Sequence, residues 1–75
     1  MLRVLVTKHA KRRLAQVRQT GITLEDCIRA VRKIPGNIPK ATRFRGFIST
    51  NGQMYDIVVK DIPNGRLIIT IIGKK

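Results

Sequence analysis

Residues 7–26 read TKHAKRRLAQVRQTGITLED, and this stretch predicts two helices that meet near Gly21. Thr7 is suited to cap the first helix, because its hydroxyl can accept a backbone N–H that the first turn leaves unpaired. Gly21 ends this helix, since glycine readily adopts the left-handed conformation that follows many helices. The apolar residues at the spacing of one helical face are Ala10, Leu14 and Val17.

The second predicted helix begins at Thr23. Thr23 and Asp26 form a shortened capping box, in which each side chain can bond the backbone N–H of the other residue. Pro35-Gly36 then stops the helix, because proline cannot continue it. The stripe expected to face the core repeats at i, i+3, i+4 and i+7, and consists of Leu24, Cys27, Ile28 and Val31.

Two strands follow on either side of Asn51-Gly52, the preferred sequence of a two-residue type I′ hairpin turn. In that register Ile48 pairs with Tyr55. Because strand side chains alternate between the two faces, one face becomes apolar and should meet the helices. It holds Phe44, Ile48, Tyr55, Ile57 and Val59, whereas the other face holds Arg43, Arg45, Phe47, Ser49, Asp56 and Lys60.

A turn over residues 61–65 leads to a third strand over residues 66–72, with Lys60 expected opposite Arg66. Residues 2–6 are either a short strand or an N-terminal extension. The predicted fold is a single α+β domain over residues 1–75, (β)ααβββ, with two helices packed on one face of an antiparallel meander. Cations are expected around Phe47 and Thr70 on the other face, namely Arg43, Arg45, Lys60 and Arg66.

Charge is the strongest global signal, because sixteen Lys and Arg residues against four Asp and Glu residues give a net charge of +12. Such a field attracts polyanions, so RNA or DNA is the first expected partner and an acidic protein the second. An anionic membrane surface ranks third, because the sequence has no long basic amphipathic helix with aromatic anchors. No apolar run approaches the ~20 residues that span a bilayer, and we expect no membrane partner. A chain of 75 residues has a small core, which a homodimer or another partner chain would supplement.

The single cysteine, Cys27, cannot form an internal disulfide, which fits a reducing, cytoplasmic setting. One cysteine, one histidine and four scattered carboxylates supply a metal site poorly. The sequence also lacks glycine-rich phosphate-binding motifs and a nucleophile with a paired base. We therefore expect no cofactor.

Arg43, Arg45 and Phe47 indicate a nucleic-acid surface on the second face of the sheet. Arginines can bind phosphates, while an aromatic ring between them can stack on an unpaired base. An ordinary solvated face, with Phe47 covered by a neighbouring element, is an equal alternative. The full set predicted to bind nucleic acid consists of Lys8, Lys11, Arg12, Arg43, Phe47, Lys60 and Arg66.

His9 is the only histidine and lies early in the first helix, with Arg13 one turn further along the same flank. Most single histidines are ordinary surface or capping residues. A helix N-terminus and neighbouring cations nevertheless favour neutral imidazole, which can accept a proton at neutral pH. RNA can be cleaved without metal when its 2′-hydroxyl attacks the adjacent phosphate and cations stabilise the developing charge. For such a reaction the expected catalytic residues are His9, Arg13 and Arg45.

The pattern Thr7-x-His9-Ala10-x-x-Arg13-Leu14, followed by Gly21-Ile22-Thr23-x-Glu25-Asp26, resembles the opening motif of a family of small uncharacterised domains. These domains group with RelE-like toxins and with the wider barnase–colicin–RelE ribonuclease fold. The later Arg43-Phe44-Arg45-Gly46 segment and the final apolar strand also fit. The resemblance implies a helix pair on a curved antiparallel sheet and, as in related toxins, metal-independent RNA cleavage countered by a bound antitoxin.

The same resemblance makes His9 and Arg13 the characteristic helical pair, and Arg43 and Arg45 the basic strand pair. Two features depart from the family pattern. Residues 17–20 lengthen the turn before Gly21, and the only tyrosine, Tyr55, is predicted to face the core, whereas RelE-like sites use a late tyrosine.

Three functions remain open from the sequence. The first is a toxin-like, metal-independent endoribonuclease of a toxin–antitoxin type, inhibited by an acidic antitoxin. The second is a non-catalytic nucleic-acid-binding module that uses the basic sheet face. The third is an assembly protein whose charge docks an acidic protein partner. Fold kinship alone does not separate them.

Overall fold

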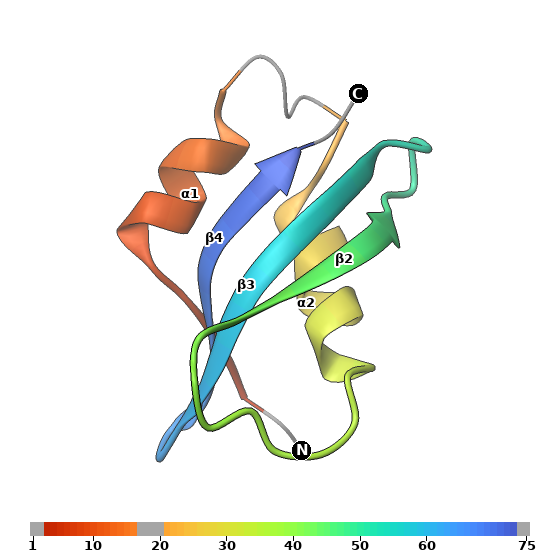
Figure 1. Cartoon of the computed structure of the whole chain (residues 1–75). Coiled ribbons are helices and arrows are strands. Elements are labelled where there is room, and N and C mark those ends of the chain that lie inside the picture. Colours follow the sequence, from red (N-terminus) through yellow and green to blue (C-terminus); the bar gives the residue numbers. More distant parts are fainter. Residues whose placement is uncertain (1–2, 17–20, 74–75) are drawn as a thin grey trace.

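The computed structural model describes residues 3–16 and 21–73 and has α+β architecture, as predicted (Figure 1). Four strands form one mixed sheet in the order β1-β4-β3-β2. Helix α2 lies across one face of this sheet, and helix α1 lies alongside β4 (Figure 1). The elements in chain order are β1 (Val4–Val6), α1 (Lys8–Leu14), α2 (Leu24–Arg32), β2 (Thr42–Ile48), β3 (Met54–Ile62) and β4 (Gly65–Gly73).

Residues 4–6 belong to the sheet as strand β1. This strand pairs in parallel with β4, with Val4 opposite Arg66 and Val6 opposite Ile68. The prediction of a purely antiparallel meander is therefore wrong, although β2, β3 and β4 are successive antiparallel neighbours. Without β1, the backbone groups at this end of β4 would lack partners, which is costly for a largely apolar strand.

Thr7 joins β1 to α1 and bonds both the helix and the sheet. Its hydroxyl accepts the Ala10 N–H at 3.0 Å, which confirms the predicted N-cap, and donates to the Ile69 carbonyl at 2.8 Å. Arg13 donates from Nε to the Ile71 carbonyl at 3.3 Å. Helix α1 therefore covers the part of the β4 edge that lies beyond β1. It ends at Leu14, earlier than the predicted end at Gly21, and the predicted turn over residues 17–20, with Val17, lies outside the described residues.

Helix α2 begins with the predicted capping box. The Asp26 N–H donates to the Thr23 hydroxyl and the Thr23 N–H donates to the Asp26 carboxylate, both at 3.1 Å. The helix ends at Arg32, shortly before the proline and glycine that were predicted to stop it. The predicted apolar stripe is wrong at Leu24, which is 37% exposed, because the helix is rotated to bury Asp26. The buried residues of α2 are Asp26, Cys27, Ala30 and Val31.

The turn between β2 and β3 has three residues rather than two. Ser49 and Gln53 close it through a 2.8 Å backbone bond, and the Gly52 N–H donates to the Ser49 carbonyl at 2.9 Å. Gly52 has a φ of +82°, while no described residue other than glycine has positive φ. A type I′ turn needs positive φ at both central positions, so Asn51-Gly52 does not form one. Ile48 consequently pairs with Met54 instead of Tyr55.

A bulge in β2 displaces the pairing again. Phe44 lies opposite Ile57 and Phe47 lies opposite Tyr55, so two residues, Arg45 and Gly46, stand opposite a single residue of β3. Gly46 has a φ of +83°, a conformation that glycine adopts without steric cost. An extra residue shifts the alternation of side chains by one position beyond the bulge.

Phe47 therefore faces the core and not the outer face on which it was predicted. Phe44 and Phe47 both pack against the buried cluster, and the Phe47 ring lies 5.7 Å from the Tyr55 ring. Tyr55 is buried, as predicted. Ile48, predicted in the core, is 66% exposed because it follows the bulge on the opposite face.

The pairing of β3 with β4 also differs from the prediction. Asp61, not Lys60, lies opposite Arg66, and the turn contains only Pro63 and Asn64 between the paired residues Ile62 and Gly65. A shift of one residue moves a side chain to the other face of a sheet. Arg66 therefore faces α2 and is buried, whereas it was predicted on the outer face.

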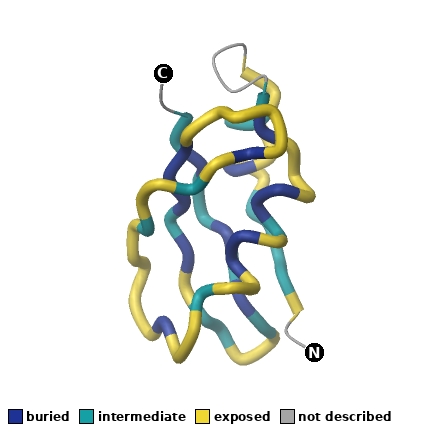
Figure 2. Tube along the Cα trace, turned by 90° about the vertical axis from the view of Figure 1, so that its right-hand side faces the viewer, coloured by how far each residue is buried: buried dark blue, intermediate teal, exposed yellow. Residues whose placement is uncertain are grey.

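The core lies between α2 and the strands, with α1 closing one side. Figure 2 shows the buried segments gathered in the middle of the molecule, whereas the connecting loops are mostly exposed. Five of the seven residues of β2 are exposed as well. α1 contributes little more than Ala10, with Leu14 packed at the margin. The buried apolar residues are Ala10, Ile22, Cys27, Ala30, Val31, Ile38, Tyr55, Ile57, Val59, Ile68 and Ile71.

Gly65 allows β1 to approach the start of β4. It has a φ of +145°, and a Cβ atom there would collide with the carbonyl oxygen of Arg3. We expect Gly65→Ala to lower the free energy of unfolding by about 3 kcal/mol, since strain and overpacking add. Gly36→Ala is the control, because Gly36 has a φ of +79° but open space around it, and should cost about 1 kcal/mol. Urea unfolding measures both, and equal effects of the two substitutions would contradict the contact with Arg3.

Candidate nucleic-acid interface

Three of the four carboxylates are largely covered by other residues, and each pairs with an arginine. Asp26 lies 3.0 Å from Arg29, Asp56 lies 2.7 Å from Arg43, and Asp61 lies 2.7 Å from Arg66. Only the fourth carboxylate, Glu25, is exposed. The acidic residues are therefore used inside the fold, and the surface carries almost no negative side chain.

The cations have the opposite distribution. All described lysines and arginines are exposed except two: Arg66 is buried, and Arg13 is half-buried. Arg29 and Arg43 are paired with Asp26 and Asp56, whereas the other nine exposed cations outnumber the one exposed carboxylate, Glu25. This excess of positive charge creates a potential that attracts polyanions. The exposed cations are Arg3, Lys8, Lys11, Arg12, Arg29, Arg32, Lys33, Lys40, Arg43, Arg45 and Lys60.

The predicted catalytic residues do not come together at one point. His9 is exposed on α1, and its imidazole makes no hydrogen bond to another described residue. Arg13, one turn further, directs Nε to the β4 edge. Arg45 is exposed in the bulge of β2, at the other end of the sheet, with β4 and β3 between the two groups. Neighbouring strands lie ~4.8 Å apart, so about 10 Å or more of sheet separates them.

The set predicted to bind nucleic acid divides into two groups. Lys8, Lys11, Arg12, Arg43 and Lys60 are exposed, as such a role requires. Phe47 and Arg66 do not lie on the outer face. Phe47 faces α2 because of the bulge, and Arg66 is only 3% exposed because of the shifted pairing.

Arg66 uses all its N–H groups within the fold. Nη1 donates to the Val31 and Ile34 carbonyls, and Nη2 donates to the Gly36 carbonyl, each at 2.8 Å. Nε and Nη2 also donate to the two carboxylate oxygens of Asp61, at 2.7 and 3.2 Å. A guanidinium has five N–H donors, so none is left for a phosphate.

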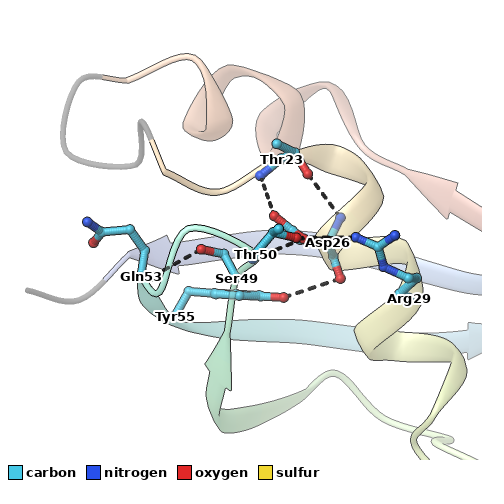
Figure 3. A network of polar contacts seen from close by, with 7 residues as sticks. All are labelled: Thr23, Asp26, Arg29, Ser49, Thr50, Gln53 and Tyr55. Carbon is cyan, nitrogen blue, oxygen red and sulfur yellow. Dashed lines mark hydrogen bonds and ion pairs between the residues drawn. The ribbon is translucent and has the colours of Figure 1, made fainter.

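Asp26 forms a second polar centre, which sequence reasoning recognised only as a cap (Figure 3). One oxygen accepts the Thr23 N–H, and the other accepts the Thr50 hydroxyl at 2.6 Å and the Thr50 N–H at 3.3 Å. The Tyr55 hydroxyl donates to the Asp26 carbonyl at 3.2 Å. This network fixes the β2–β3 turn to the first turn of α2. The capping motif reveals the Thr23 bonds, but no local pattern reveals Thr50 as a partner.

These bonds determine the acidity of Asp26. The hydrogen bond from the Thr50 hydroxyl is the largest cause that holds the pKa of Asp26 well below its ordinary value of 3.8. Burial acts in the opposite direction, and the bonds from Thr23 and the Thr50 backbone add to the lowering. Asp26 is therefore ionised at neutral pH and accepts hydrogen bonds only.

A hollow of about 260 Å³ lies beside this network, between α2 and the β2–β3 turn. Arg29 of α2 and Lys33, the C-cap residue one turn further on, line one side of it, while Phe47 and Thr50 line it from the hairpin. It therefore combines two cations with an aromatic ring. Neither Arg29 nor Lys33 was among the predicted site residues, because their position beside Phe47 depends on the bulge.

The thiol of Cys27 and the phenol of Tyr55 are both buried. Burial raises the pKa of the Cys27 thiol to about 12, which keeps it in the unreactive thiol form. Burial likewise raises the pKa of Tyr55 to about 12. Within residues 3–16 and 21–73, no group of three or more His, Cys, Asp or Glu residues is placed to hold a metal ion.

Comparisons of the chain with protein-family models, with curated proteins and with solved structures found no match. Among the described helices, none has both the length and the apolar character needed to cross a bilayer.

Asp26→Asn tests the role of the network in stability. The folded pKa of Asp26 is lowered, so its contribution to stability is complete above the unfolded value of 3.8 and is lost as pH falls below it. At pH 7 we expect the free energy of unfolding of the variant to be about 2 kcal/mol below that of the native chain. On acidification this free energy should fall less in the variant than in the native chain.

Urea unfolding at neutral and acidic pH measures both effects. The variant should keep some pH dependence, because the hydrogen bond from Arg66 lowers the pKa of Asp61 as well. Glu25→Gln is the matched control, since Glu25 is exposed and bonds no described residue. Equal acid sensitivity of the native chain and Asp26→Asn would be evidence against this account.

Proposed function

We propose that this chain is a nucleic-acid-binding module that holds phosphates through its exposed cations. The observation that carries the proposal is the sorting of charge. Asp26, Asp56 and Asp61 are each paired with one arginine, so among the described residues Glu25 alone offsets the nine other exposed lysines and arginines. Neutralising phosphates releases their bound counterions, and this supplies most of the affinity of non-specific binding.

The geometry favours binding over cleavage. A general base and the cation that stabilises the developing charge must reach the same phosphate, within hydrogen-bond distance of the reacting atoms. His9 lies on α1 beside one end of the sheet, and Arg45 lies on β2 at the other. The two side chains start from opposite edges of the sheet, and this favours contacts with successive phosphates of a strand laid across the sheet over contacts with one phosphate.

A toxin-like, metal-independent endoribonuclease with an acidic antitoxin is the second candidate. One observation favours it: His9 is exposed, bonds no described residue, and has the cations Lys8, Arg12 and Arg13 within one turn on the same short helix. In this case the site would consist of α1 residues, with Arg13, one turn from His9, as the accompanying cation.

Binding should depend steeply on salt. For a short duplex, log affinity should fall linearly with log salt concentration, with a slope of about −0.9 per phosphate contacted. Lys8→Gln combined with Lys11→Gln should weaken binding, and the slope should become shallower by about one unit for each phosphate that the variant no longer neutralises. Fluorescence anisotropy at several salt concentrations measures both, and Glu25→Gln is the control that should leave the slope unchanged or steeper. A duplex that stays unbound at low salt would refute the proposal.

Cleavage is tested separately with single-stranded RNA in EDTA. If the second candidate holds, the native chain cleaves, and His9→Ala reduces the rate by about 10²-fold or more because the general base is removed. Arg45→Ala should then change the rate little, since β2 lies far from α1. RNA that stays intact at high protein concentration leaves binding as the function, and a large rate reduction with Arg45→Ala would contradict the separation described above.

A further inference from the structure

The hollow between α2 and the β2–β3 turn has a lining that suits a single nucleotide. At about 260 Å³ it is slightly smaller than pockets for drug-sized ligands, so it suits one ring-bearing group. Its lining is part apolar, from Ala30 and Phe47, and part polar, from Ser49 and Thr50. Two cations stand at it, Arg29 and Lys33. A base and its phosphate need this combination of an apolar contact and a positive charge.

Arg29 is held in place by two neighbours, but some of its N–H groups have no partner among the described residues. Its Nη2 bonds the Asp26 carboxylate at 3.0 Å and the Thr50 hydroxyl at 3.5 Å. Nε and Nη1 bond no described residue, and 59% of the side chain is exposed. An arginine whose orientation is fixed by a second residue loses less entropy on binding a phosphate. Lys33 adds a second charge one turn further along α2.

Asp26 does not cancel this positive site, although it lines the hollow. Both of its oxygens are occupied by donors from Thr23, Thr50 and Arg29. Only 5% of its side chain is exposed. Its charge is therefore compensated locally, while Lys33 has no acidic partner among the described residues.

Phe47 supplies the apolar contact. The ring lies 5.7 Å from Tyr55 at a tilt of 31°, and the side chain remains half-buried and lines the hollow. Stacking on such a ring tolerates any base, because every base has a π face.

We infer that this hollow receives one nucleotide of an unpaired strand, with the base against Phe47 and the adjoining phosphate at Arg29 and Lys33. The inference rests on the proposed nucleic-acid binding and places one contact of it at a defined site. The site is separate from the cations of α1 and from those of the outer sheet face.

The test uses the full chain and fluorescently labelled single strands of about eight nucleotides, either RNA or DNA, each with an abasic strand of equal length. Phe47→Leu should weaken binding of the ordinary strand about tenfold and leave binding of the abasic strand unchanged, because the substitution removes only the contact with the base. Lys33→Gln should weaken binding of all strands more than Lys60→Gln does. Lys60 is exposed on the other face of the sheet, so the two variants remove the same charge at different places.

Circular dichroism and thermal unfolding establish that each variant is folded. The comparison of Lys33→Gln with Lys60→Gln tests the inference even if Phe47→Leu is destabilised, since both lysines are exposed. Selective weakening by Lys33→Gln with either RNA or DNA supports the inference. Equal effects of Lys33→Gln and Lys60→Gln would overturn the inference and leave the proposed function intact. A native chain that binds none of the strands would overturn both.

Discussion

The buried guanidinium of Arg66 connects the parts of this small fold that are distant in sequence. It donates to the carbonyl of Val31 in the last turn of α2, to those of Ile34 and Gly36 just after the helix, and to the carboxylate of Asp61. Asp61 in turn accepts the Ile38 N–H at 2.8 Å, and its own N–H donates to the Ile38 carbonyl at 2.7 Å. A charge out of water is costly unless every donor is satisfied, and here every donor is. One side chain thus fixes the end of a helix, a loop and a strand pair.

Asp26 connects the first turn of α2 to the β2–β3 turn. The helix is therefore tied to the sheet at both ends, by an aspartate at its start and by an arginine at its end. This arrangement suits a chain whose apolar core is thin. It also explains why a strongly basic protein keeps carboxylates where it does. Asp26, Asp56 and Asp61 stabilise the fold from within, and the repulsion among the remaining cations is left to the surface, where solvent and salt reduce it and where a polyanion can relieve it.

Features encoded within a few residues could be predicted from the sequence. Thr7 and Thr23 cap helices because their partners lie three residues away, and Tyr55 is buried as expected. The face on which a strand side chain lies could not be predicted, because it depends on the exact residue pairing between strands. The β2–β3 turn has three residues, β2 bulges at Gly46, and the pairing opposite Arg66 is shifted by one residue. Each of these changes moves side chains to the other face of the sheet, and as a result Phe47 and Arg66 face inward. The predicted cations of α1 are therefore exposed as expected, whereas the sheet residues Phe47 and Arg66 lie on the face opposite to the predicted one.

The bulge has a further consequence for how copies of this chain behave in a crowded solution. β2 ends the sheet, and no described strand covers its outer edge. A regular edge of seven residues would be a template on which another chain could add strand after strand. Arg45 and Gly46 interrupt the spacing of its hydrogen-bonding groups, and Arg43 and Arg45 place like charges where two such edges would meet. The irregularity that turns Phe47 inward thus also discourages fibre growth.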